Sequence, residues 1–312
     1  MTIVRTPYDA LPAGLLDELT LAGLDARSVY DAVVLAIAED LPGEDVTSAA
    51  TIPDTARGTA DLAAREPGVV AGLTVAALVF HYVMGDDVKV TDRVADGSTV
   101  APGDVVMRVS GPIRGLLTAE RTALNYASHL SGVATATAAW VAALDGTRAR
   151  VLDTRKTLPT YRALQKYAVR CGGGLNHRFS LSDMALVKDN HVVAAGGVVP
   201  AYQAVRSAYP DLPVEVEVTD LGQLRELLDA GCERILLDNM DCPTMAEAVR
   251  LVERRATEQG AATGRATLEA SGGLTFERAR EVAETGVDFI SVGALTHSVK
   301  VFDLGLDLQE QA

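Results

Sequence analysis

The sequence contains few aromatic residues, and this scarcity argues against one way of binding nucleic acid. Phe, Trp and Tyr make up 4% of the 312 residues. Proteins that bind single-stranded nucleic acid stack its bases on aromatic side chains. The net charge of −14 also opposes a general affinity for nucleic acid or for anionic membranes. We therefore expect neither nucleic acid nor a membrane as a partner.

Long apolar runs and a recognisable cysteine pattern are also missing. The nearest approach to a membrane span, Ser131–Leu144, is rich in small residues and shorter than the roughly 18 apolar residues that a span needs. The segment Met1–Leu16 lacks the basic start and continuous apolar run of a signal peptide. Three scattered cysteines show no metal-ligand spacing. These features predict a reduced, cytoplasmic protein.

The second half of the chain alternates short β-branched runs with helical patterns. Each run is followed by a crossover, which predicts a parallel sheet. The spacing suits a closed or nearly closed barrel, although a standard barrel has eight strands and the spacing alone leaves closure open. The six expected strands are Ala149–Asp153, Ala185–Lys188, Val214–Val218, Arg234–Asp238, Thr267–Ser271 and Phe289–Gly293.

The first half has a different pattern, typical of an α+β domain. An amphipathic helix is expected over Asp25–Asp40. A second helical run, Arg114–Leu144, is expected to break at Ser131-Gly132. The expected strands are Gly58–Ala64, Val69–Ala71, Val88–Thr91 and Val105–Val109, with turns at Asp96-Gly97 and Pro102-Gly103.

Charged residues stand at the ends of four of the six expected barrel strands. They are Asp153, Lys188, Glu217 and Asp238, whereas the last two strands end in glycine-bearing turns at Ser271-Gly272-Gly273 and Val292-Gly293. The carboxyl ends of barrel strands form the active-site face. Glycine turns there expose backbone N–H groups that bind phosphate. The pattern predicts a polar, ionic substrate that carries a phosphate.

A basic segment stands out in this acidic chain. Arg150–His191 holds eight lysines and arginines against three aspartates, a net charge of +5, so the rest of the chain carries −19. The spacing of Arg162, Lys166 and Arg170 is typical of a solvated helix face. Arg155, Arg178 and Lys188 could instead neutralise several carboxylates or phosphates. Glu217 and Asp238 suit ribose hydroxyls or, through water, a Mg2+ held by substrate phosphates.

Short motifs recur along the whole chain. In the second half they are DTRKTLP at 153–159, KYAVRCGGG at 166–174, NHR at 176–178, LVKDNH at 186–191, EVEV at 215–218, LLDN at 236–239, ASGG at 270–273 and VGALTHS at 292–298. In the first half they are Glu39-Asp40, GEDVTS at 43–48 and AERTALN at 119–125. Together these motifs resemble the quinolinate phosphoribosyltransferase family, and the resemblance covers nearly the whole chain, in order.

The resemblance implies an architecture and an assembly. We expect an α+β sandwich cap domain over residues 1–130 and an incomplete α/β barrel of about six parallel strands over residues 131–297. Residues 298–312 are expected to return to the cap domain. The implied assembly is a homodimer, in some cases within a higher oligomer, whose active sites are shared because each cap covers the partner's barrel.

The resemblance also implies roles for particular residues. It assigns quinolinate to Arg121, Arg155, His177, Arg178 and Lys188. Lys156, Glu217 and Asp238 are the implied catalytic residues, and they would meet the ribose, pyrophosphate and Mg2+ of phosphoribosyl pyrophosphate, with Glu217 and Asp238 reaching the metal through water or substrate. Around the 5-phosphate it places Ser271, Gly272, Gly273, Gly293, Ala294 and His297.

The implied reaction is decarboxylating phosphoribosyl transfer to quinolinate, giving nicotinate mononucleotide, CO2 and pyrophosphate for de novo NAD biosynthesis. Three alternatives stay open: a paralogous transferase for another heteroaromatic acid, a Schiff-base lyase using Lys188, and a non-catalytic barrel that senses a phosphorylated sugar. Thr160-Tyr161 and Phe179-Ser180 depart from the family's usual residues in loops beside the substrate.

Overall fold

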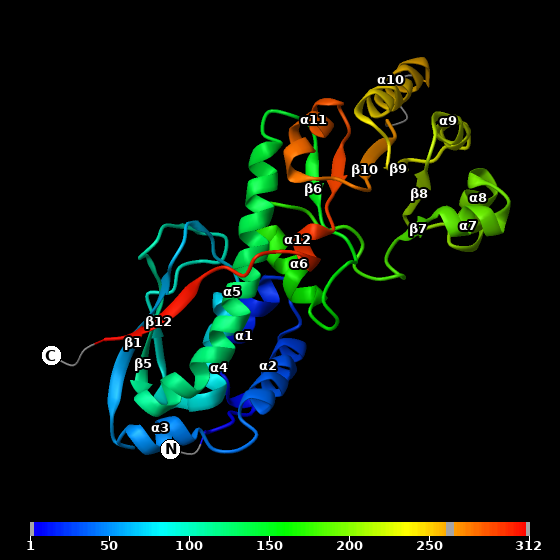
Figure 1. Ribbon diagram of the computed structural model, residues 1–312. Coiled ribbons are helices and arrows are strands. Elements are labelled where there is room, and N and C mark those ends of the chain that lie inside the picture. Colours follow the sequence, from blue (N-terminus) through cyan, green and yellow to red (C-terminus); the bar gives the residue numbers. More distant parts are fainter. Residues whose placement is uncertain (1–2, 260–264, 310–312) are drawn as a thin grey trace. The chain divides into compact units, whose positions relative to one another are not determined.

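The computed structural model describes residues 3–259 and 265–309 (Figure 1). The chain divides into two compact units. The first comprises the chain through Ala138 together with Pro159–Gly173 and the C-terminal segment from Ser298. The second comprises Ala139–Leu158 and Gly174–His297. The segment Pro159–Gly173, expected inside the barrel domain, therefore packs with the first unit.

The first unit is built on an antiparallel sheet in the order β12-β1-β5-β3. Figure 1 shows β12, from the C-terminal segment, beside β1. A separate pair joins β2 and β4. The strands are β1 (Arg57–Ala64), β2 (Gly68–Val69), β3 (Lys89–Thr91), β4 (Thr99–Val100), β5 (Val105–Pro112) and β12 (Leu304–Leu308).

The first unit also contains helices. They are η1 (Tyr8–Ala10), α1 (Ala13–Leu21), α2 (Ala26–Asp40), α3 (Val46–Thr51), α4 (Leu73–Met84), η2 (Gly85–Asp87), α5 (Ile113–Ala143) and α6 (Arg162–Cys171). Of these, α4 packs on β5 and against α1 and α2. Helix α4 is apolar almost all round and is correspondingly buried along nearly its whole length. Asp25 caps α2 by accepting the backbone N–H of Ser28 (2.7 Å), which fixes the start expected from the sequence.

Two sequence expectations in this unit are wrong. Helix α5 continues without a break through Ser131-Gly132. The Ser131 hydroxyl bonds both backbone groups of Ala71, and a Cβ on Gly132 would lie 2.3 Å from the Lys300 carbonyl oxygen. These small residues allow close packing of α5. Lys166, expected on a solvated helix face, is 2% exposed.

The second unit contains the expected parallel sheet of six strands. Its order is β6-β11-β10-β9-β8-β7. Among the described residues, the two outer strands do not pair with each other, although Leu175 makes an isolated bridge to Leu152 of β6. The fold class is therefore confirmed as an incomplete barrel. The strands are β6 (Arg150–Leu152), β7 (Ala185–Val187), β8 (Val214–Val218), β9 (Arg234–Asp238), β10 (Thr267–Ser271) and β11 (Phe289–Ser291).

Helical segments connect these strands, as the alternating pattern requires. They are α7 (Asp189–Ala195), α8 (Val198–Ala208), α9 (Leu221–Asp229), α10 (Cys242–Gln259), η3 (Phe276–Arg278), α11 (Ala279–Glu284) and α12 (Ala294–His297). Across the described part of the chain, no helix has the length and apolar character needed to cross a membrane. The carboxyl ends of the strands lie at one rim, where the charged residues gather.

Candidate active site

A cavity of about 280 Å³ lies in the second unit at the strand ends. Six of the expected site residues line it: Arg155, Lys156, His177, Arg178, Lys188 and Ser271. The remaining lining residues are Thr154, Leu186, Leu236, Glu269 and Ser291. Four of the six expected residues are Lys or Arg. The cavity therefore has walls suited to an anion with more than one charged group.

Arg155 and Arg178 are close enough to influence each other. Burial, and then the positive charge of Arg155, lower the pKa of the Arg178 guanidinium. One Arg178 nitrogen, Nη1, donates to the backbone oxygen of Met184 (3.1 Å), which orients the guanidinium. Two like charges held together in a partly buried pocket repel each other. An anionic ligand would relieve that repulsion.

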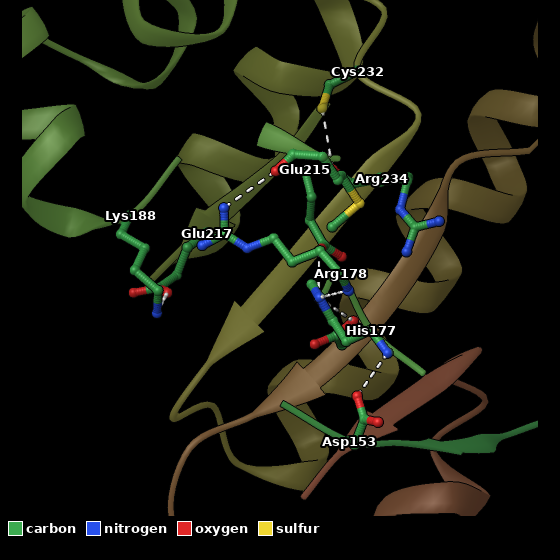
Figure 2. Close-up of polar contacts among 10 residues, drawn as sticks. Asp153, His177, Arg178, Lys188, Glu215, Glu217, Cys232 and Arg234 are labelled. Atoms are coloured by element: carbon green, nitrogen blue, oxygen red, sulfur yellow. Dashed lines mark hydrogen bonds and ion pairs between the residues drawn. The ribbon is translucent and has the colours of Figure 1, made fainter. Parts of the chain in front are cut away.

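The Asn176-His177-Arg178 segment is held by one buried carboxylate. Asp153, at 0% exposure, accepts hydrogen bonds from the Asn176 amide (2.6 Å) and from the His177 backbone N–H (2.9 Å). Figure 2 shows Asp153 beneath His177, with Arg178 directly above. Asp153 follows β6, so the end of one barrel strand fixes the segment that carries His177 and Arg178, both expected to bind quinolinate. The sequence pattern identified Asp153 only as a charged strand end.

His177 occupies the floor of the cavity between two buried glutamates. Its Nε2 lies 2.9 Å from Glu215 Oε2 and 3.4 Å from Glu269 Oε2. Its Nδ1 accepts the backbone N–H of Arg178 (2.7 Å). Sequence reasoning missed both glutamates as site residues. One signal could have identified these glutamates: each is an acidic residue flanked by apolar residues within an expected strand, as Glu269 is within Thr267–Ser271.

Lys188 and Glu217 form an ion pair at the rim. Lys188 Nζ lies 3.2 Å from Glu217 Oε2, and the Lys188 side chain is 50% exposed. Lys188, expected to bind quinolinate, and Glu217, expected to meet the metal, thus form an ion pair with each other.

The glycine turns lie beside the expected phosphate-binding residues. Gly272 and Gly273 have φ values of 87° and 56°, a backbone conformation that favours glycine. A Cβ on Gly293 would lie 3.0 Å from the Lys156 side chain and 3.1 Å from His297 Nε2. The Thr296 hydroxyl donates to the Lys156 carbonyl oxygen (2.8 Å), which ties the Lys156 loop to α12. Thr296 was not identified from the sequence.

Asp238 ends β9 and is held by the residue that follows it. The Asn239 amide donates to Asp238 Oδ2 (2.9 Å), and a Cβ on Gly272 would meet Asn239 Oδ1 at 2.4 Å. Glu217 stands at the end of the neighbouring strand β8. Carboxylate oxygens at adjacent strand ends are hard donors, which suits Mg2+ shared with substrate phosphates. Ala294, which begins α12, lies next to Gly293.

Arg121 belongs to the first unit. It lies in α5, whose mostly buried surface is interrupted by Arg121 and Asn125, both exposed. A larger cavity of about 460 Å³ also lies in the first unit, lined in part by Asp45 and Arg114. Both side chains already bond within that unit, to Thr118 and Ser48 and to two carbonyl oxygens. The cluster of substrate-type cations is in the smaller cavity.

The fold and the cavity define a class of protein. An α/β barrel with a cationic pocket at its strand ends, and glycine turns on its last two strands, is typical of an enzyme acting on a phosphorylated, anionic small molecule. Comparison with known families then narrows this class. Residues 133–307 match the C-terminal domain of quinolinate phosphoribosyl transferase, and residues 45–131 match its N-terminal domain. The chain belongs to the quinolinate phosphoribosyltransferase family.

Individual relatives agree with this assignment. The nicotinate-nucleotide pyrophosphorylase [carboxylating] of Mycobacterium leprae is 51% identical over 290 residues, covering 92% of this chain and 100% of the relative. The solved nicotinate-nucleotide pyrophosphorylase from Francisella tularensis has a TM-score of 0.82 at 33% identity, covering 99% and 100% of the two chains. The one from Ehrlichia chaffeensis has a TM-score of 0.82 at 31% identity, covering 89% and 98%.

Proposed function

We propose that the cationic cavity is where this chain carries out the reaction of its family. Phosphoribosyl pyrophosphate and quinolinate give nicotinate mononucleotide, CO2 and pyrophosphate, a step of de novo NAD biosynthesis. The chain is thus a decarboxylating phosphoribosyltransferase, the activity named for its relatives. The observation that carries the site assignment is the grouping of Arg155, Arg178 and Lys188 around one cavity of about 280 Å³.

Quinolinate carries two neighbouring carboxylates, and the cavity offers matching cations. Arg155 and Arg178 can each present a planar fork to a carboxylate, while Lys188 acts as a point charge. Lys188 must exchange Glu217 for substrate, since the two are paired without ligand. His177 lies at the floor of the same cavity. Arg121 of the partner subunit completes the quinolinate site in this proposal, because Arg121 is exposed on α5.

The sugar phosphate is proposed to bind along the other strand ends. Its 5-phosphate meets the glycine turns, Ser271-Gly272-Gly273 and Gly293-Ala294, together with His297. Glu217 and Asp238 hold the ribose and, through water or substrate, Mg2+. Bound Mg2+ would neutralise charge on the departing pyrophosphate. The ion pair of Glu217 with Lys188 Nζ, at 3.2 Å, supports this role, since it places the carboxylate where a cation can approach it.

The chemistry needs positioning and charge more than a nucleophilic side chain. The pyridine nitrogen attacks the anomeric carbon while the bond to pyrophosphate breaks, and positive charge develops on the ribose. Lys156 stabilises the negative charge of the departing pyrophosphate. The ribosylated ring is cationic, and this charge stabilises the carbanion that remains at ring carbon 2 when the 2-carboxylate departs as CO2. A proton then completes the ring carbon.

We further propose a cytoplasmic homodimer with shared active sites, in which higher oligomers can form. The exposed position of Arg121 supports a shared site, since it leaves the guanidinium available to a second copy. The net charge of −14 opposes binding to nucleic acid or membrane. The neighbouring possibility, a paralogue acting on another heteroaromatic acid, lacks an observation in its favour, because three cations exceed the need of a monocarboxylate.

One assay tests the proposal. Purified protein is incubated with quinolinate, phosphoribosyl pyrophosphate and Mg2+, and both nicotinate mononucleotide and released CO2 are quantified. We expect the two products in equal amounts. Formation of a nucleotide that retains both carboxylates, or the absence of any nucleotide, would contradict it. Omitting phosphoribosyl pyrophosphate is the control for decarboxylation by another route.

A further inference from the structure

The cavity floor contains an acid that the reaction outlined above does not use. Glu269 lies in the middle of β10, is 1% exposed, and lines the same cavity as Arg155 and Arg178. Within the described part of the chain, neither carboxyl oxygen of Glu269 has a donor in full hydrogen-bond geometry, although the side chains of His177 and Ser291 approach the carboxyl group. A buried ionised carboxylate with such weak donors is costly. The position therefore requires either a proton on Glu269 or a ligand that supplies a donor.

The hydrogen bonds of His177 show which neighbour could supply that donor. The Arg178 backbone N–H donates to His177 Nδ1 (2.7 Å), so this nitrogen keeps its lone pair and carries no proton. The single ring proton is then on Nε2. It points toward Glu215 at 2.9 Å, whereas Glu269 is more distant at 3.4 Å. The ring proton therefore serves Glu215 rather than Glu269.

The same geometry locates an additional proton in the cluster. Burial, and then the charge of Glu215, raise the pKa of Glu269. Burial alone would lower the pKa of His177, but Glu215 and Glu269 outweigh it and raise this pKa to about 9. The raised pKa values of Glu269 and His177 both indicate that this group of interacting side chains retains one additional proton. Because His177 Nδ1 is occupied by an N–H donor, the proton is accommodated on Glu269.

The protonated Nε2 also argues against a metal ion here. His177, Glu215 and Glu269 offer ligand atoms within 4.8 Å of one another. A histidine ligand must present a lone pair to the metal, and in this tautomer Nε2 has none. Quinolinate presents only acceptors, namely two carboxylates and a ring nitrogen. An ionised Glu269 would repel it, whereas a neutral carboxylic acid can donate a hydrogen bond.

We infer that Glu269 acts as a neutral acid that donates its O–H to a carboxylate of quinolinate, making it a further specificity residue at the cavity floor. This inference rests on the proposed function of the cavity. Arg155, Arg178 and Lys188 favour a negatively charged ligand, and Glu269 adds a directional hydrogen-bond donor at the floor of the cavity. The charged and titratable groups around Glu269 are Asp153, Arg155, Lys156, His177, Arg178, Lys188 and Glu215.

The test is calorimetric binding of quinolinate to the full-length protein over a pH series. In the wild-type protein, affinity should fall by up to about tenfold per pH unit above the pKa of free-enzyme Glu269, with linked proton uptake. Glu269→Gln keeps a hydrogen-bond donor, so it should still bind quinolinate, but its binding should not be accompanied by this proton uptake. At pH values below the Glu269 pKa, Glu269→Ala should bind quinolinate at least about tenfold more weakly than wild type, and its affinity should lack this pH dependence. Glu258→Gln, an exposed change of the same charge, should behave as wild type.

Three outcomes would overturn the inference. They are a Glu269→Gln protein that keeps the wild-type proton uptake, equal weakening in the glutamine and alanine proteins, and undiminished binding in the alanine protein. If Glu269→Ala fails to fold, the comparison of glutamine with wild type decides alone. Arg155→Ala separates this inference from the site assignment: unchanged quinolinate binding in that variant would refute the assignment of the cavity itself.

Discussion

Replacing Arg178 by alanine should impair the enzyme through the substrate rather than through the fold. Among the residues that the structure describes, the Arg178 side chain donates a hydrogen bond to Met184 O, whose loss costs roughly 1 kcal/mol. Removing it also relieves the repulsion from Arg155. We therefore expect the free energy of unfolding to change by about 1 kcal/mol or less, so the variant should remain folded at assay temperature.

The effect on catalysis should be much larger. A guanidinium fork to a carboxylate supplies charge-assisted hydrogen bonds of roughly 1.5–3 kcal/mol each. Losing about 2.7 kcal/mol reduces kcat/KM for quinolinate by about a hundredfold. Arg178→Lys keeps the positive charge but loses the planar fork, so its kcat/KM should lie between those of wild type and Arg178→Ala. Steady-state kinetics gives kcat/KM, and chemical denaturation followed by circular dichroism gives the free energy of unfolding.

The control for Arg178→Ala must be an exposed arginine outside the cavity. Lys166, which the sequence pattern favours as a solvated position, is unsuitable because it is buried. Arg225 on α9 is exposed and bonds only weakly to Leu221 O at 3.4 Å. Arg225→Ala should change kcat/KM less than about threefold. Equal losses in the two variants would show that Arg178 does not face the substrate.

Three further predictions follow from the site and the core. Glu217→Ala or Asp238→Ala should impair use of phosphoribosyl pyrophosphate while calorimetry still detects quinolinate binding; the reverse pattern would contradict their roles. Arg121→Ala and Arg155→Ala should each be nearly inactive as pure homodimers. When the two variants are mixed and subunit exchange is proven, about half the dimers are mixed and each mixed dimer has one intact site, so about a quarter of all sites should recover activity. No recovery would exclude a shared site. Gly132→Ala should destabilise the protein by about 1–3 kcal/mol in chemical denaturation, because its Cβ would lie 2.3 Å from Lys300 O; an unchanged midpoint would refute that packing argument.

The barrel was predictable because its signals are local. Each expected strand is a short β-branched run, and observed strands such as Val214–Val218 and Arg234–Asp238 agree with expectation at both ends. The helix over Ala26–Asp40 was predictable for the same reason, since its apolar period and its Asp25 cap are both within the segment. Local patterns of this kind fix the element type without tertiary information.

The errors occurred where distant residues decide. Ser131-Gly132 resembles a helix break, but Ala71 and Lys300, both far along the chain, use these small residues for close packing. Lys166 has the spacing of a solvated face, yet tertiary packing buries it. The pairing of Lys188 with Glu217 and the donation from Arg178 N–H to His177 depend on geometry that no spacing specifies.

The central claim is that the cavity recognises a dicarboxylate, and a comparison of quinolinate with nicotinate tests it most directly. Nicotinate lacks the 2-carboxylate, so it would form fewer charge-assisted hydrogen bonds with Arg155, Arg178 and Lys188 than quinolinate forms. We measure kcat/KM for both acids with saturating phosphoribosyl pyrophosphate and Mg2+. The account predicts a value for nicotinate at least about a hundredfold lower, the equivalent of about 2.7 kcal/mol. Comparable turnover of the two acids would contradict it.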